Sequence, residues 1–252
     1  MISPRNKYFI STIFIFLLSW NACTNGDIRL TMAEIDGVFI KAWQSLKNGE
    51  TKEALVDLYG LEYEWKILKE TEFELYEEAE NPPAIQKIDR LLQTAKEAAK
   101  GGNSAEAFVA LDRIRLKLIQ FRKLHHIDYY LDNIWLFHNN YVVFNEVAND
   151  DVLCWLTWEE VAKEANILNQ LWKPILRNNP PQEVFQLSKN ADLNFQRSRK
   201  ALNEELKHLT ILIECADREN MALSSQKIGR HLEGIIEVFA YEDTAEISLL
   251  LE

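Results

Sequence analysis

Glycine and proline are scarce in this sequence, with 8 glycines and 6 prolines among 252 residues. All-β proteins need many turns, and turns depend heavily on these two residues. No alternating run of strand length occurs either, so an all-β fold is disfavoured. Hydrophobic residues make up 47% of the chain, including 7 tryptophans, which is enough for a substantial core. The sequence therefore predicts an all-α protein.

Cysteine is also rare. Apart from Cys23, the chain has only Cys154 and Cys215, too few for the disulfide framework of a small secreted domain. Each lies among apolar neighbours, which favours two buried free thiols. The alternative is a disulfide between them in an oxidising compartment.

A long apolar run is missing as well. The candidate, residues 8–18, is shorter than the roughly 20 residues that a membrane-spanning helix needs. Arg5 and Lys7 precede this run and the small residue Ala22 follows it. A positive end, a short apolar centre and a small exit residue are typical of a secretory signal peptide, here residues 1–22.

Because Cys23 directly follows Ala22, the segment resembles a bacterial lipoprotein signal. The resemblance covers residues 1–23 and implies cleavage before Cys23, a lipid on that cysteine, and a membrane tether over residues 23–30. Thr24 is not the aspartate that the same resemblance links to inner-membrane retention, which favours the outer membrane, facing the periplasm or the cell surface. The alternative is ordinary cleavage after Ala22, which leaves a secreted protein without a lipid.

Positive charge is in deficit, with 28 Lys and Arg against 39 Asp and Glu and a net charge of −11. Removal of residues 1–22 makes the remainder more acidic still, because that segment holds Arg5 and Lys7 and no acidic residue. Nucleic acid is therefore excluded as a partner, since its backbone is bound by clustered basic side chains. Flat binding to anionic lipid is disfavoured for the same reason. A basic protein partner or a cationic ligand fits this charge.

Apolar residues recur with helical spacing along almost the whole chain. The first stripe, for example, comprises Ile35, Phe39, Ala42, Trp43 and Leu46, and Asn48-Gly49 ends the helix. We expect about eight antiparallel helices in bundle packing, over residues 31–47, 51–80, 84–100, 104–121, 127–148, 150–175, 182–215 and 218–240.

Similar landmarks in the two halves suggest a duplication. Trp65 and then Asn81-Pro82-Pro83 in the first half correspond to Trp172 and Asn179-Pro180-Pro181 in the second. This pattern predicts two four-helix units, residues 31–124 and 125–252. A solenoid of tetratricopeptide-like repeats is the alternative, but its period of roughly 34 residues does not fit the spacing of the helix starts.

Four polar residues could form a metal site around the start of the fifth predicted helix. His125, Asp128 and Asp132 have spacings that share a helix face, and His138 lies on the apolar stripe of the same helix. Imidazole and carboxylate groups are ligands for zinc or copper. The competing interpretation is structural: a core histidine at position 138, and an acidic helix start that complements the helix dipole.

Sequence motifs for catalysis are missing. The chain has no glycine-rich phosphate loop, no Gly-x-Ser-x-Gly, no His-Glu-x-x-His and no Cys-x-x-Cys-His. A di-metal carboxylate bundle needs two Glu-x-x-His pairs, and only Glu205 to His208 supplies one. The leading hypothesis is therefore a membrane-tethered helical binding or adaptor module without evident catalytic activity, and its cofactors are unknown. The alternative is a periplasmic metal- or haem-handling bundle.

Overall fold

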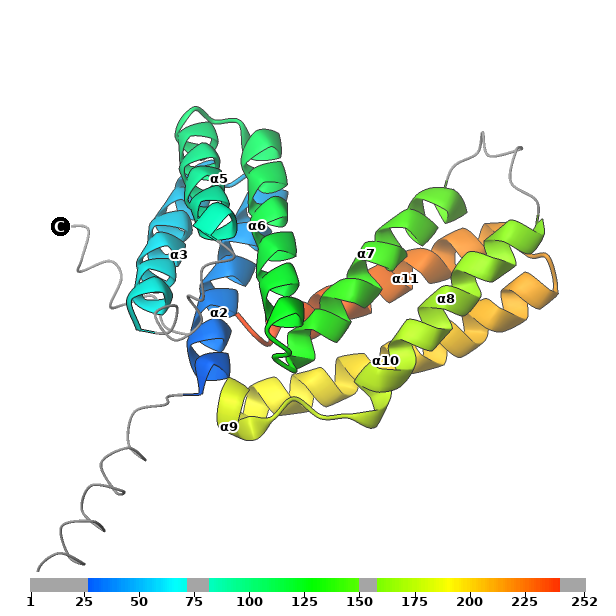
Figure 1. The fold of residues 1–252 in the computed structure, drawn as a ribbon. Coiled ribbons are helices and arrows are strands. Elements are labelled where there is room, and N and C mark those ends of the chain that lie inside the picture. The colour runs from blue at the N-terminus through cyan, green and yellow to red at the C-terminus, as the bar shows by residue number, and fades with distance from the viewer. Residues whose placement is uncertain (1–26, 72–81, 150–157, 241–252) are drawn as a thin grey trace, which may run out of the picture.

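The computed structural model describes residues 27–71, 82–149 and 158–240, and within these ranges every regular element is a helix. The prediction of an all-α bundle is confirmed (Figure 1). The helices are α2 (Ile28–Lys47), α3 (Thr51–Thr71), α5 (Pro82–Lys100), α6 (Ser104–Leu124), α7 (Tyr130–Asn149), α8 (Trp158–Arg177), α9 (Gln182–Phe185), α10 (Lys189–Glu214) and α11 (Arg218–Glu237). None of the helices in these ranges is long and apolar enough to span a membrane.

The longer helices pack in two groups of four. In the first group α2 contacts α3, α3 contacts α5, α5 contacts α6, and α6 returns to α2. In the second group α7, α8, α10 and α11 close in the same order. The chain passes between the groups in the short connection from α6 to α7, and the two groups diverge from that point (Figure 1). The one-turn helix α9 packs back on α2 and joins the groups a second time.

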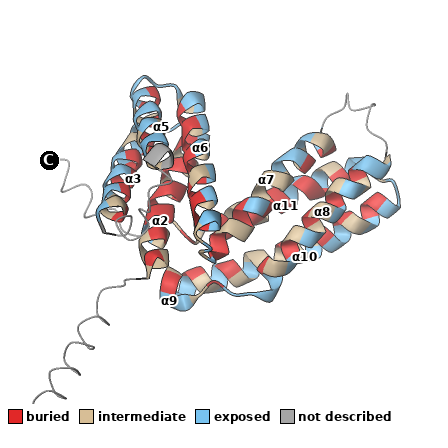
Figure 2. Ribbon diagram, viewed as in Figure 1, coloured by how far each residue is buried: buried red, intermediate tan, exposed pale blue. Residues whose placement is uncertain are grey.

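One apolar core runs through both groups, and helix α2 contributes many of its residues. All five residues of the stripe predicted for this helix are buried, and the buried faces of the other helices point inward in the same way (Figure 2). The periodicity did not hold everywhere, because Tyr63 on α3 is 51% exposed and Val142 on α7 is 40% exposed.

Indole N–H groups hold corresponding helices together in the two groups. Trp65 on α3 donates to Asp89 on α5 over 2.7 Å, and Trp172 on α8 donates to Asn203 on α10 over 3.3 Å. In each group the donor lies on the second of the four helices and the acceptor on the third. The two landmark tryptophans therefore have equivalent structural roles.

Several predicted boundaries were wrong. The long helix expected over 182–215 is broken into α9 and α10, because Gln186 adopts a left-handed backbone with φ of 44° and the Ser188 hydroxyl caps α10 through the Ala191 N–H. The fifth helix begins at Tyr130 instead of 127.

The prediction of a buried thiol at Cys215 was also wrong, because this cysteine is exposed. The predicted helix start at 150–151, Cys154, the acidic end of the second helix and the segment before Asp27 lie outside the described residues.

Candidate functional site

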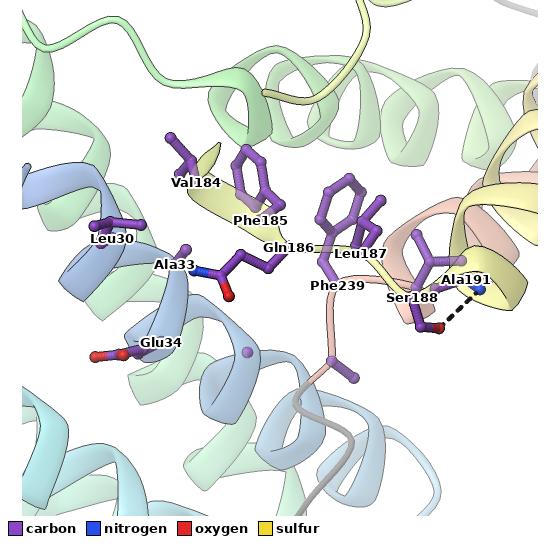
Figure 3. A pocket seen from close by; sticks show the side chains of 13 residues that line it. Leu30, Ala33, Glu34, Val184, Phe185, Gln186, Leu187, Ser188, Ala191 and Phe239 are labelled. Atoms are coloured by element: carbon purple, nitrogen blue, oxygen red, sulfur yellow. Dashed lines mark hydrogen bonds between the residues drawn. The ribbon is translucent and has the colours of Figure 1, made fainter. Parts of the chain in front are cut away.

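A pocket lies where α2, α9 and the end of α11 meet, at the junction of the two helix groups. Its volume is about 390 Å³, within the roughly 300–1,000 Å³ of small-ligand sites. Figure 3 shows α2 on one side and the α9 segment with Phe239 on the other. The lining residues are Leu30, Ala33, Glu34, Gly37, Val184, Phe185, Gln186, Leu187, Ser188, Ala191, Val238, Phe239 and Ala240.

An aromatic cluster forms one wall of this pocket. The rings of Phe185 and Phe239 are edge to face with centroids 5.1 Å apart. Behind them, Tyr129 stacks against Phe185 at 5.4 Å, and Tyr130 lies 6.4 Å from Phe239. The Tyr130 hydroxyl donates to the carbonyl of Ile175, which fixes the cluster to α8. This wall is therefore anchored to the core and offers a preformed apolar surface.

The break between α9 and α10 supplies two polar side chains of the pocket, Gln186 and Ser188. Gln186 is exposed, and its side chain extends from the α9 segment toward Ala33 on α2 (Figure 3). Left-handed backbone is uncommon for a residue other than glycine or asparagine, and such positions cluster at functional sites. The side-chain amide carries both a donor and an acceptor that can meet the main chain of a bound molecule.

Negative charge dominates the rim on the α2 side. Glu34 is exposed and has no ion pair with any described residue. It lies close enough to Glu64 on α3 that the pKa of Glu64 is raised, first by burial and then by the Glu34 charge. Arg29, at the start of the same helix, is engaged by Asp27 at 2.5 Å. Among the described residues, Glu34 is thus a carboxylate with a like charge beside it and without a cationic partner.

A buried ionic cluster lies one residue from the pocket lining. Arg122 on α6 donates to Asp132 on α7 over 2.6 Å and stacks 4.4 Å from the Tyr129 ring. Its second partner is Asp36 on α2, at 3.7 Å. Burial raises the pKa of Asp36 to about 6, and Arg122 opposes that rise. The Tyr129 hydroxyl lies near the Asp36 carboxylate without a well-formed hydrogen bond to it. This cluster ties together the three helices that meet behind the pocket.

The four predicted metal ligands are not gathered in one site. Asp132 is occupied by Arg122, and Asp128 is exposed. His125 stacks on Phe121 with centroids 4.4 Å apart. Within the part of the chain that the structure describes, no three His, Cys, Asp or Glu side chains lie close enough to hold a metal ion.

His138 has the surroundings of a core histidine. Its ring packs edge-on against Trp43 and Trp135, with both centroid distances 5.6 Å. Burial lowers the pKa of His138 to about 4, and the positive charge of Arg115 acts in the same direction. The imidazole is therefore neutral at physiological pH.

A second hollow lies between the end of α2, the start of α3 and the end of α11. It is larger, about 640 Å³, but its lining is mainly polar. Lys47 and Glu233 form an ion pair across this hollow. The Ser45 hydroxyl donates a hydrogen bond to the Asp57 carboxylate over 3.4 Å. Burial raises the pKa of Asp57 to about 6. This hollow offers no apolar wall comparable to that of the first pocket.

Sequence periodicity missed the pocket because its walls come from three separated segments. The available signals were local: Pro180-Pro181 before α9, and Ser188 as a helix cap. Neither indicates that the chain folds back on α2. Comparison of the chain with protein-family models, curated proteins and solved structures found no match.

Proposed function

We propose that this protein is an exported, membrane-tethered helical adaptor that binds a partner in the pocket between its two helix groups. The observation that carries the proposal is the preformed pocket, with its aromatic wall of Phe185 and Phe239 and its exposed amide at Gln186. Binding sites commonly combine apolar walls with a few convergent polar groups. The missing catalytic motifs agree with a binding role.

The tether would place this pocket near the membrane. Only residues 24–26 separate the proposed lipidated Cys23 from Asp27, which caps α2. Fully extended, such a linker spans roughly 3.5 Å per residue. Leu30, Ala33 and Glu34, in the first two turns of α2, line the pocket. The binding site would therefore lie within a few nanometres of the lipid anchor, on the side of the protein that faces the membrane.

Lipidation is tested by metabolic labelling with a fatty-acid analogue in a bacterial host. The wild-type chain should be labelled and processed, whereas Cys23→Ala should carry no label, because the thiol is the acceptor. Equal labelling of the two chains would show that Cys23 does not hold a lipid.

The pocket is tested with Nile red, a neutral apolar dye whose emission rises in a dry environment. The wild-type protein should bind about one dye per chain in a saturable manner. Ala33→Trp should weaken that binding about tenfold or more, because the indole would fill the space between α2 and α9.

Val143→Trp is the matched control, since Val143 is 51% exposed on the outer surface of α7 and does not line the pocket. Ala33→Leu provides a smaller filling if the tryptophan variant unfolds, as judged by circular dichroism. Dye binding that survives in both folded Ala33 variants would refute the pocket as the binding site.

A further inference from the structure

We infer that the partner is a basic peptide segment, in which an apolar side chain enters the pocket and a flanking lysine or arginine pairs with Glu34. This inference rests on the proposed function and specifies the chemistry of its partner. The elements that carry it are the size of the pocket, the charge at its rim and the exposed amide of Gln186.

The size of the pocket suits an anchor side chain. A volume of about 390 Å³ lies near the lower end of the range for ligand sites. Protein interfaces commonly concentrate their binding energy in an aromatic or aliphatic anchor that fills a pocket of this kind. The rings of Phe185 and Phe239 would contact such an anchor edge-on or offset, which is the favoured geometry of aromatic pairs. The pocket is thus complementary to one large apolar residue.

The charge at the rim selects a cation beside that anchor. Glu34 has no positive partner among the described residues, and Glu64 adds a second carboxylate close by. At the start of the same helix, the carboxylates of Asp27, Glu183 and Asp128 all act on one cation, Arg29. A lysine or arginine next to the anchor would relieve the repulsion between Glu34 and Glu64.

The same charge disfavours a phospholipid as occupant. A phosphate-bearing headgroup would bring negative charge toward Glu34 in a chain whose net charge is already −11. A peptide avoids this penalty and also offers main-chain N–H and C=O groups. The exposed amide of Gln186, which extends toward α2 over the pocket, can satisfy one of them (Figure 3).

The experiment is a peptide-display selection on the purified mature chain, residues 23–252. The library fixes one central phenylalanine, leucine or tryptophan and randomises three residues on each side. Wild-type protein should enrich peptides with lysine or arginine beside the anchor. Glu34→Lys should lose this preference and favour acidic flanks, because the charge that selects the flank has been reversed.

Affinity measurements on synthetic peptides then separate charge from anchor. The probes are the best selected basic peptide, the same peptide with its basic residues changed to glutamate, and the same peptide with its anchor changed to alanine. Glu34→Gln should bind the basic peptide about fivefold more weakly, as expected for the loss of a partly exposed ion pair. Ala33→Trp should abolish binding, since it fills the place of the anchor.

Glu146→Lys is the control variant, because Glu146 is exposed on α7 and does not line the pocket. It should keep the preference of the wild type. If wild-type protein enriches apolar anchors without basic flanks, and this enrichment is lost in Ala33→Trp, the proposed function stands and the basic-peptide inference is wrong. If no peptide is enriched, or if Glu34→Lys leaves the flanks unchanged, the inference is also overturned.

Discussion

Burial moves the pKa values of two side chains in this protein in opposite directions. His138 is held neutral between Trp43 and Trp135, and its pKa falls from 6.5 to about 4. Asp36 is wholly buried beside Arg122, and its pKa rises from 3.8 to about 6. Both residues titrate over the same range of mild acidity, but they act on stability with opposite signs.

The contribution of His138 to stability should be lost as the pH falls. Between pH 6.5 and about 4, the unfolded chain binds a proton at this residue and the folded protein does not. Acidification therefore destabilises the fold through His138, by up to about 3 kcal/mol at 1.36 kcal/mol per pKa unit. His138→Phe removes this loss of stability, because phenylalanine does not bind a proton. The measurement is urea unfolding of both proteins at pH 7 and pH 4.5, with a smaller loss of unfolding free energy expected for the variant.

The contribution of Asp36 to stability should depend on pH with the opposite sign. Its stabilising contribution is present below its unfolded pKa and is lost as the pH rises through about 6, so Asp36→Asn should reduce the loss of stability on going from acidic to neutral pH.

His208→Gln serves as the control for the His138 prediction, because the side chain of His208 is 49% exposed. A His138→Phe variant as acid-sensitive as the wild type would contradict the neutral state of this half-buried imidazole.

Single residues show where inference from sequence succeeded and where it could not. Helical spacing placed His138 on the inner face of its helix, and the structure agrees. The same spacing grouped His125, Asp128 and Asp132 as ligands, but Arg122 on the preceding helix engages Asp132 instead. Competition from a side chain on another helix depends on three-dimensional packing, so periodicity along one helix does not reveal it.

At the scale of elements, four helix ends share one hydrogen-bond pattern. After α2, α5, α6 and α10, three consecutive backbone N–H groups bond back to the helix. The first donates to the carbonyl four residues earlier, the second to the carbonyl three residues earlier, and the third to the carbonyl five residues earlier. The middle residue of each set has a positive φ, as in Schellman motifs. These residues are Gly49, Gly102, His126 and Ala216, with φ of 78°, 77°, 55° and 55°.

Ala216 and Gly102 occupy equivalent turns and should respond to substitution with opposite signs. In left-handed backbone the Cβ of alanine lies too close to a backbone carbonyl oxygen, whereas glycine has no Cβ. Ala216→Gly should therefore stabilise the protein by about 0.5–1 kcal/mol, and Gly102→Ala should destabilise it by a similar amount. No atom lies within 4 Å of a Cβ placed on Gly102, so backbone conformation alone sets that cost.

Thermal and urea unfolding of the two variants test this prediction. Equal effects of the same sign would contradict the common turn geometry. A fully helical residue such as Ala107, in α6, provides the control: Ala107→Gly should destabilise, because glycine is unfavourable inside a helix and a buried methyl group is lost.

The elements were mostly predictable because their signals are local. Asn48-Gly49 and Gly101-Gly102 marked helix ends, and the structure ends α2 and α5 there. The break at Gln186 was missed, since glutamine carries no preference for left-handed backbone. That error had a consequence for function, because the break creates α9 and with it one side of the pocket.

At the scale of the whole molecule, two four-helix groups meet at an angle (Figure 1). The pocket lies at their junction. The acidity of the chain and the position of the pocket beside the start of α2 support the proposal of a tethered adaptor that recognises an apolar residue in a basic segment. The fold class could be predicted from composition and periodicity. The pocket could not, because it depends on how the two groups pack against each other.

The most direct test of this account is nuclear magnetic resonance of the isotope-labelled mature chain during titration with the selected basic peptide. The account predicts that the largest changes in amide shifts fall in three segments of the pocket, residues 30–37, 184–191 and 238–240. Changes confined to the polar hollow around Lys41, Asp57 and Glu233, or spread evenly over the surface, would contradict it.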